Sequence, residues 1–378
     1  MRRRSLAFAA VVPARTTAAG TTRRGRAPVA AALVLAFALV GCNAPGPVTT
    51  STTTTTSTPA TTTTTPTVVT LPTPVAKPFD DAAAFAFARE QVEYANGTIR
   101  YRVPGTSGND EAAALIASHL RADGWAVSYD NFTANYRCAQ TPLHNVIGVR
   151  PGTSGRTAAQ QGTDAPRASS VVILGAHYDT RPIAESDPDP ANRTKPIPGA
   201  NDGASGVAVL LELARTLGPM NDTVRLVFFD AEDGGDMPNS CDTQWLIGSE
   251  RDAGSIPLAD WRNVRAMVLV DLVGDPNLSL PRELNSDSKL QDQVYSVAGS
   301  LGYAHVFTND TKNSAHITDD HVPYAQKSMP ALDLIHLVPA PQYFPEWHHT
   351  QHDDMAHVSA TSLGIVGRTL KTWLETLS

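Results

Sequence analysis

The stretch GASGVAVLLELARTLGPMNDTVRLVFFDAED, residues 203–233, holds the alternation that decides the fold. Its first half, residues 203–217, has the apolar periodicity of a helix, and VRLVFF at 224–229 predicts a strand. A strand that is apolar along its whole length favours a mostly parallel sheet with helices on both faces. The acids Asp230, Glu232 and Asp233 follow this strand directly.

The same alternation extends in both directions from this stretch. Strand-like runs occur at residues 145–150, 171–179, 264–274 and 331–338, and helical patterns at 80–95, 108–125, 243–253, 288–302 and 359–377. In the second of these helices, Asn109 or Asp110 is expected as the N-cap and Gly124 as the residue that ends the helix. The pattern predicts a single α/β domain over residues 78–378, built as a three-layer sandwich around a mostly parallel central sheet.

The N-terminal residues differ from the rest of the chain. Residues 1–41 carry seven arginines and no acidic residue, and they end in an apolar run, PVAAALVLAFALV, before GC. This is the layout of a secretory signal peptide rather than of a membrane-spanning helix. LVGC, which ends at Cys42, resembles the lipobox of bacterial lipoproteins. We therefore expect an exported protein held on the cell membrane by a lipid on Cys42; an ordinary signal peptide is the alternative.

Residues 42–77 predict a disordered tether, since 49–74 are almost entirely Thr, Ser and Pro and carry no charge. Removing the seven arginines of residues 1–41 would move the formal net charge from −7 to −14. An acidic exported domain argues against nucleic-acid binding. Besides Cys42 the chain has Cys138 and Cys241, and export to an oxidising compartment makes a disulfide between them a hypothesis.

Acids and a histidine follow the predicted strands at the points where the strands end. His177 comes after VVILGA, the acids at 230–233 after RLVFF, and Asp271 after AMVLV. Asp202 lies in a Gly-rich turn, PGANDGASG, just before a helix. Because open α/β sheets bind ligands beyond the carboxyl ends of their strands, we expect these side chains to share one rim.

The composition of this rim indicates a metal site. Carboxylates gathered this closely repel one another unless a cation neutralises them. Imidazole and carboxylate ligands suit zinc, and a catalytic zinc ion needs three protein ligands and one open position. Glu232 and Asp233 are neighbours that point different ways at a strand end. One of them can therefore bind the metal while the other faces the substrate as a general base or acid.

A dense group of histidines stands near the C-terminus, in FPEWHHTQHDD at residues 344–354. Three of the chain's eleven histidines are here: His348, His349 and His352. The segment follows the strand predicted at 331–338 and so adjoins the same rim. One of these three histidines is therefore a candidate metal ligand.

Six motifs occur in the order found in zinc-dependent exopeptidases of the aminopeptidase type: GAHYDT, PGANDGASGVAVLLELAR, FFDAEDGG, LVDLVGDPN, DDHVPY and WHHTQHDD. Over most of residues 80–378 the chain most resembles an offshoot of that group, the bacterial glutaminyl cyclases (glutaminyl-peptide cyclotransferases). Three features favour this offshoot: Glu-Asp rather than Glu-Glu in DAED, the LVDLVGDPN segment, and the additional acid Asp319 in DDHVPY.

The resemblance implies the residues that bind the metal and carry the reaction. One catalytic zinc ion (Zn²⁺) would be held by Asp202, Asp233 and His349, the histidine that precedes Thr350. Glu232 would be the catalytic acid/base.

Further residues would support this centre. The resemblance implies that Asp271 and Asp319 are linked to Glu232 by hydrogen bonds and that His177 lies close to the metal. In the aminopeptidases, His177 and Asp271 would instead complete a second zinc site. The residue types present here are compatible with one zinc ion or with two.

The chain departs from the family at one motif. The family typically reads Trp-His-Thr, with the tryptophan lining the substrate pocket, whereas this chain reads Trp347-His348-His349-Thr350. His348 is either an insertion or stands in the tryptophan position, so Trp347 and His348 are both candidates for the pocket. Trp245, which follows the acidic motif, either lines the pocket or packs beneath it.

The implied activity is cyclisation of an N-terminal Gln on a peptide or protein to pyroglutamate, with release of ammonia. The alternative is a metalloaminopeptidase that uses two zinc ions to hydrolyse N-terminal residues. A binding lipoprotein with a degenerate site is disfavoured, because none of the expected ligands is missing from the sequence.

Overall fold

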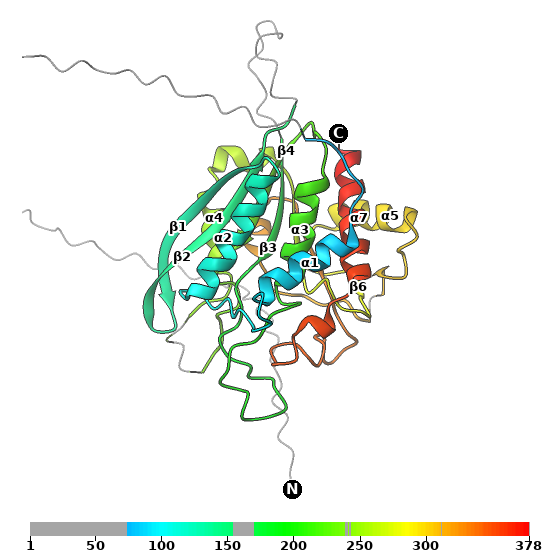
Figure 1. Cartoon of the computed structure of the whole chain (residues 1–378). Helices are drawn as coiled ribbons and strands as arrows, with labels where there is room; N and C mark the ends of the chain where they lie inside the picture. Colours follow the sequence, from blue (N-terminus) through cyan, green and yellow to red (C-terminus); the bar gives the residue numbers. More distant parts are fainter. Residues whose placement is uncertain (1–73, 154–169, 239–240, 242, 311, 378) are drawn as a thin grey trace, which may run out of the picture. The chain divides into compact units, whose positions relative to one another are not determined.

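Four parallel strands form the centre of the structure, with helices packed on both faces of the sheet (Figure 1). The computed structural model describes residues 74–153, 170–238, 241, 243–310 and 312–377. The helices are α1 (Asp81–Val92), α2 (Ser107–Ala122), α3 (Ala204–Thr216), α4 (Ile247–Ser255), α5 (Ser288–Ser300), α6 (Val322–Ala325) and α7 (Ala360–Thr376), with 3-10 turns η1 (Leu258–Asn263) and η2 (Met355–His357). The strands are β1 (Ala126–Tyr136), β2 (Ala139–Arg150), β3 (Val171–His177), β4 (Thr223–Phe229), β5 (Val264–Asp271), β6 (Leu280–Pro281), β7 (Phe307–Thr308) and β8 (Ala331–Ile335).

The main sheet has the order β1-β2-β4-β3-β5-β8. β4, β3, β5 and β8 run parallel, while β2 is antiparallel to β4 and β1 is antiparallel to β2. The chain passes from β3 to β4 on one side and then crosses to β5 on the other. The carboxyl end of β3 therefore lies where the connections diverge, which is the usual ligand position in such sheets.

Alternate residues of the central strands enter different cores. Val172 and Leu174 belong to the larger hydrophobic cluster, shared with α1, α2, α3, α5 and α7. Ile173 and Val227 belong to a second cluster on the opposite face, together with Tyr324 of α6. These strands are buried on both sides, as their continuous apolar sequences predict. The predicted three-layer α/β sandwich is thereby confirmed.

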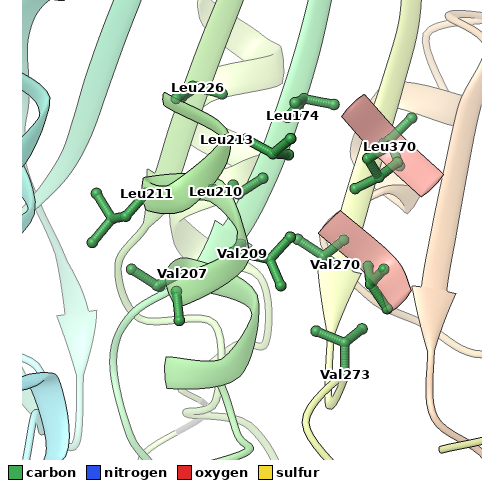
Figure 2. Packing of buried hydrophobic residues seen from close by; sticks show 14 of the residues in the cluster. Leu174, Val207, Val209, Leu210, Leu211, Leu213, Leu226, Val270, Val273 and Leu370 are labelled. Atoms are coloured by element: carbon green, nitrogen blue, oxygen red, sulfur yellow. The ribbon is translucent and has the colours of Figure 1, made fainter. Parts of the chain in front are cut away.

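Helix α3 anchors the larger cluster. Figure 2 shows Leu210 and Leu213 of α3 among Leu174 and Val270 of the sheet and Leu370 of α7. All five side chains are 1% exposed or less, and full burial of a leucine contributes roughly 1.5–3 kcal/mol to stability. This packing fixes the position of the loop that precedes α3, which carries Asp202.

The predicted start of α2 differs from the structure. α2 begins at Ser107 with Thr106 in the N-cap position, so the N-cap prediction of Asn109 or Asp110 is wrong. The amide of Asn109 is used elsewhere, because it donates to the carbonyl oxygen of Arg102 and to Asp230. Gly124 follows the helix as expected, with a left-handed φ of +77° that is typical of the residue after a helix.

The antiparallel edge is also larger than the sequence pattern indicated. The run at 145–150 is only the second half of β2, and the paired strand β1 carried no strand prediction. β1 alternates between exposed and half-buried residues over most of its length. It therefore lacks the continuous apolar signal of the central strands.

The described residues belong to one compact unit that spans Thr67–Ser378. The predicted signal peptide at 1–41, the lipid site at Cys42 and nearly all of the predicted tether at 42–77 lie outside the described residues. Within the described ranges, no helix combines the length and the apolarity needed to cross a membrane.

A disulfide joins Cys138 to Cys241, which confirms the pairing hypothesis. Cys138 lies in the turn between β1 and β2, and Cys241 lies in the segment between the acids that follow β4 and helix α4. The same two segments are joined by a hydrogen bond from the Asn135 side chain to the Cys241 carbonyl oxygen, at 2.9 Å. The disulfide thus connects the β1–β2 hairpin to the loop that follows the acidic residues Glu232 and Asp233.

We predict that replacing both cysteines, Cys138→Ser with Cys241→Ser, lowers the free energy of unfolding by about 2–5 kcal/mol. The bond closes a loop with a sequence separation of 103 residues, so its loss frees a large part of the unfolded chain. Denaturant unfolding followed by circular dichroism measures the change. An unfolding midpoint equal to that of the unaltered protein would contradict the prediction.

Candidate active site

Three strands of the parallel sheet end at one edge, and each brings an acid or a histidine there. β3 ends at His177, β5 ends at Asp271, and β4 is followed by Glu232 and Asp233. In the sheet register His177 lies opposite Phe229, the last residue of β4. The predicted convergence of these strand ends on one rim is therefore present in the structure.

Sharp turns aim the side chains of this rim. Ala231, Leu272 and His349 all adopt left-handed backbone conformations, with φ values of 56°, 51° and 56°. For residues other than glycine this conformation costs roughly 1–3 kcal/mol and persists only where the surroundings enforce it. Two of these residues adjoin Glu232 and Asp271. The strain thus lies where the chain must turn to present an acid.

His177 is surrounded by carboxylates. Its Nε2 lies 3.0 Å from Asp202 Oδ1 and 3.3 Å from Asp271 Oδ1, and its Nδ1 lies 3.4 Å from Asp179 Oδ1. Burial disfavours the imidazolium form, but these carboxylates raise the pKa of His177 well above its usual value. The geometry places His177 beside two acids that could share a cation with it.

Asp202 also faces the C-terminal histidines. Its Oδ2 lies 3.7 Å from His349 Nε2 and 3.8 Å from His348 Nε2. His349 Nε2 is in turn 3.3 Å from Asp233 Oδ1. The structure thus brings together the three residues that the resemblance implied as zinc ligands, Asp202, Asp233 and His349, and adds His348 to their surroundings.

Two groups of side chains are arranged as metal ligands in the described part of the chain. One comprises His177, Asp202 and Asp271, and the other comprises Asp202, His348 and His349. Asp202 belongs to both groups. Within each group the ligand atoms lie within 4.8 Å of one another, close enough for a single ion.

Unpaired polar atoms show that these residues fit a zinc ion. The Oδ2 atom of Asp233 is buried without forming a hydrogen bond, and the ring nitrogens of His177 lie against carboxylate oxygens only. A buried polar atom without a partner destabilises the fold by about 1–3 kcal/mol. A cation bound among imidazole and carboxylate groups would satisfy such atoms, and this ligand chemistry suits zinc.

A buried acid cluster adjoins the metal-binding groups. Glu232 and Asp319 are 8% and 4% exposed. Burial, together with Asp233 and Asp319, raises the pKa of Glu232 well above its usual value, against the opposing effect of His177. Burial and the nearby Asp271 raise the pKa of Asp319 in the same direction. Both carboxyl groups therefore hold a proton more readily than an exposed acid does, as a proton carrier requires.

Two further carboxylates hold the backbone of the rim. Asp353 accepts hydrogen bonds from the backbone N–H groups of Asn201 and Asp202, at 2.8 and 3.1 Å. Asp179 accepts from the N–H groups of Glu232 and Asp233, at 3.1 and 3.3 Å. The role of Asp179 was not foreseen, although its place in GAHYDT beside His177 offered a signal.

The candidate pocket residues differ in their surroundings. Trp347 is 6% exposed, packs with Leu272 and Leu337, and donates from Nε1 to Asp275 at 2.8 Å. Its place is in the interior rather than on an open wall of the site. His348 and Trp245 are half-buried and stack against the metal-facing His349, with ring centroids 3.7 and 6.4 Å away.

Sequence reasoning overlooked Arg181 and Glu185. Arg181 follows the GAHYDT motif, and its side chain contacts both Asp233 and Glu185. Glu185 contacts His349 at 3.0 Å. Glu185 lies in an irregular, Pro-rich loop without helical or strand periodicity, so no local pattern predicted that it would reach the site.

Comparison with known proteins assigns the family. Residues 157–374 match the model of Peptidase family M28, so the chain belongs to that family. The glutaminyl-peptide cyclotransferase-like protein of Bos taurus is 24% identical over 303 residues, covering 72% of this chain and 71% of the relative. The glutaminyl cyclase structure from Porphyromonas gingivalis is 29% identical with a TM-score of 0.68, covering 80% of this chain and 100% of that one.

A Zn-dependent exopeptidase structure from Parabacteroides distasonis is equally similar. It is 29% identical with a TM-score of 0.67, and covers 80% of this chain and 99% of that one. The resemblance to glutaminyl cyclases and the zinc exopeptidase-like fold, both inferred from motifs, are thereby confirmed.

We predict that His349→Ala releases most of the bound zinc, whereas His348→Ala retains it. The reason is that His349 Nε2 faces both Asp202 and Asp233, while His348 Nε2 faces Asp202 from 3.8 Å. Zinc per chain is measured after gel filtration, with the exposed His352→Ala as the matched control. The opposite result, with zinc lost from His348→Ala and retained by His349→Ala, would show that His348 is the ligand instead of His349.

Proposed function

We propose that this member of Peptidase family M28 is a zinc-dependent glutaminyl-peptide cyclotransferase. It would act on peptides or proteins with an N-terminal Gln and convert that residue to pyroglutamate with release of ammonia. The observation that carries the proposal is the position of Glu232. This buried acid lies beside the His/Asp groups and near Asp319, in a chain similar to glutaminyl cyclases over most of its length.

The reaction is intramolecular. The α-amine of the N-terminal Gln attacks the carbon of its own side-chain amide, a carbon–nitrogen bond forms, and the bond to the amide nitrogen breaks to release ammonia. Glu232 accepts the proton that the amine loses and delivers it to the departing nitrogen. A raised pKa suits this exchange, because the same carboxyl group must both take up and release a proton near neutral pH.

When a zinc ion is bound by Asp202, Asp233 and His349, it supplies a Lewis acid that polarises the amide carbonyl. Asp271 and Asp319 would hold the proton of Glu232 within the acid cluster. His348 and Trp245, stacked beside His349, offer half-buried ring surface against which the Gln side chain could fold into a reactive shape.

The second candidate function is hydrolysis of N-terminal residues by a metalloaminopeptidase. A specific observation favours it: His177, Asp202 and Asp271 form a second group of suitable ligands that shares Asp202 with the first. The two groups would hold two zinc ions, which would supply the activation of a water molecule, and Glu232 would act as the base. The similarity to a Zn-dependent exopeptidase is compatible with that reaction.

We predict that a Gln-initiated peptide yields pyroglutamate and one ammonia per turnover, while a Leu-initiated peptide is left intact. Mass spectrometry of the peptide and an ammonia assay distinguish the two functions. Release of free leucine, together with two zinc ions per chain, would favour the aminopeptidase instead.

Glu232→Gln should lower kcat by about 10²–10⁴, because general acid–base catalysis contributes a factor of that size. The amide keeps the shape of the side chain but cannot exchange the proton. The exposed Glu346→Gln serves as the control. Full turnover by the Glu232 variant would exclude this residue as the proton carrier in either reaction.

We further propose that the enzyme is exported and held on the membrane by a lipid at Cys42. Support comes from the signal-like residues 1–41 and from the disulfide, which is typical of oxidising compartments. Cys42→Ser should move the protein from the detergent phase to the aqueous phase on Triton X-114 partition. Equal partition of both proteins would contradict the lipid anchor.

A further inference from the structure

The side chain of Arg181 makes four polar contacts next to the candidate metal centre, one of them from Nη1 to the carbonyl oxygen of Asp233 at 3.3 Å. Its Nε donates to Glu185 Oε1 at 2.7 Å, its Nη1 to Asp233 Oδ1 at 3.0 Å, and its Nη2 to the carbonyl oxygen of Gly235 at 3.1 Å. The side chain is only 3% exposed. The planar guanidinium therefore has a fixed orientation and joins one candidate zinc ligand to Glu185.

Glu185 joins the same guanidinium to the other side of the centre. Its Oε1 lies 3.0 Å from His349 Nδ1. Arg181 donates to the same Oε1 atom. A carboxylate beside Nδ1 favours the tautomer of His349 that carries its proton on Nδ1. Nε2 is then the ring nitrogen that faces Asp202 and Asp233.

These contacts close into a ring. Asp233 is bound by Arg181, Arg181 by Glu185, and Glu185 by His349, whose Nε2 lies 3.3 Å from Asp233 Oδ1. The backbone strengthens the link, since the N–H of Ser186 donates to the carbonyl oxygen of His349 at 3.2 Å. Neither Asp233 nor His349 can turn away without breaking a charged contact that is at least partly buried.

Arg181 also adds a positive charge beside the acids of the site. Its guanidinium contacts the carboxylates of both Asp233 and Glu185. The guanidinium thus lessens repulsion among the acids without occupying Asp233 Oδ2, which makes no hydrogen bond.

We propose that Arg181 and Glu185 are positioning residues of the metal centre. Glu185 fixes the tautomer and the ring orientation of His349, and Arg181 holds Glu185 and Asp233 in the spacing that zinc requires. A carboxylate that accepts from the far nitrogen of a ligating histidine has this effect at metal sites in general. The inference rests on the zinc ligands of the proposed function, but it does not depend on which reaction the centre catalyses.

The test is zinc affinity, measured by competition with a chromophoric chelator on the full folded protein. Glu185→Ala should weaken zinc binding about 10- to 100-fold, the usual effect of losing such a partner. Glu185→Gln keeps an acceptor oxygen but not the charge, so its loss should be smaller. Co²⁺ substitution gives a second readout, because altered orientation of His349 changes the visible absorption of the bound cobalt.

Glu346→Gln, a change at an exposed residue of the same histidine-bearing segment, is the matched control and should bind zinc normally. Circular dichroism verifies that each variant is folded. If Glu185→Ala does not fold, the zinc affinity of Glu185→Gln tests the proposal instead. Zinc affinity within twofold of the unaltered protein, with an unchanged cobalt spectrum, would overturn the proposal.

Measurements in a His349→Ala background distinguish a failure of this proposal from a failure of the assigned zinc ligands. If Glu185 acts through His349, Glu185→Ala should have no further effect on zinc affinity in that background. An equal additional loss there would show a general structural role and overturn the proposal. If His349→Ala alone leaves the affinity unchanged, the assigned zinc ligands are wrong, whatever the result at Glu185.

Discussion

Asp202 lies between His177 on one side and the pair His348 and His349 on the other, and the rest of the site is arranged around it. One of its oxygens faces His177 at 3.0 Å, and the other faces His349 at 3.7 Å. A carboxylate in this position at the end of a parallel sheet is buried, and it is close to other acids that repel it. Such a concentration of charge is stable only if cations, protons or hydrogen-bond donors compensate it. Each neighbouring residue can be understood by which of these it supplies.

Compensation comes from several parts of the fold at once. Backbone N–H groups are turned toward Asp179 and Asp353, so these acids stabilise the loops that carry Asp202 and Asp233. Arg181 supplies a fixed positive charge. Farther along the rim, Glu232 and Asp319 have raised pKa values because burial favours their protonated forms. The same buried charge that suits a metal centre therefore also produces a proton-holding acid beside it.

Some of this arrangement was predictable because it repeats a local rule. Continuous apolar strands predicted the two-faced sheet, and parallel strands necessarily bring their carboxyl ends to one edge. His177, Glu232 and Asp271 could be placed on the rim from their positions after strands. The edge strand β1 was missed since it is partly exposed on both faces. The N-cap of α2 was misassigned because Asn109 bonds to Asp230 of a distant segment instead of to its own helix.

The sequence alone determined the class of fold, the family resemblance and the residue types at the rim, since these follow from short-range periodicity and from contiguous motifs. Only the tertiary structure decided how the loops meet. It showed that Trp347 is packed inside while His348 stands beside Asp202. It also brought Glu185 to His349, across 164 positions of sequence. No local pattern encodes that contact, because a hydrogen bond between two irregular loops depends on where the sheet and its helices place the ends of each loop.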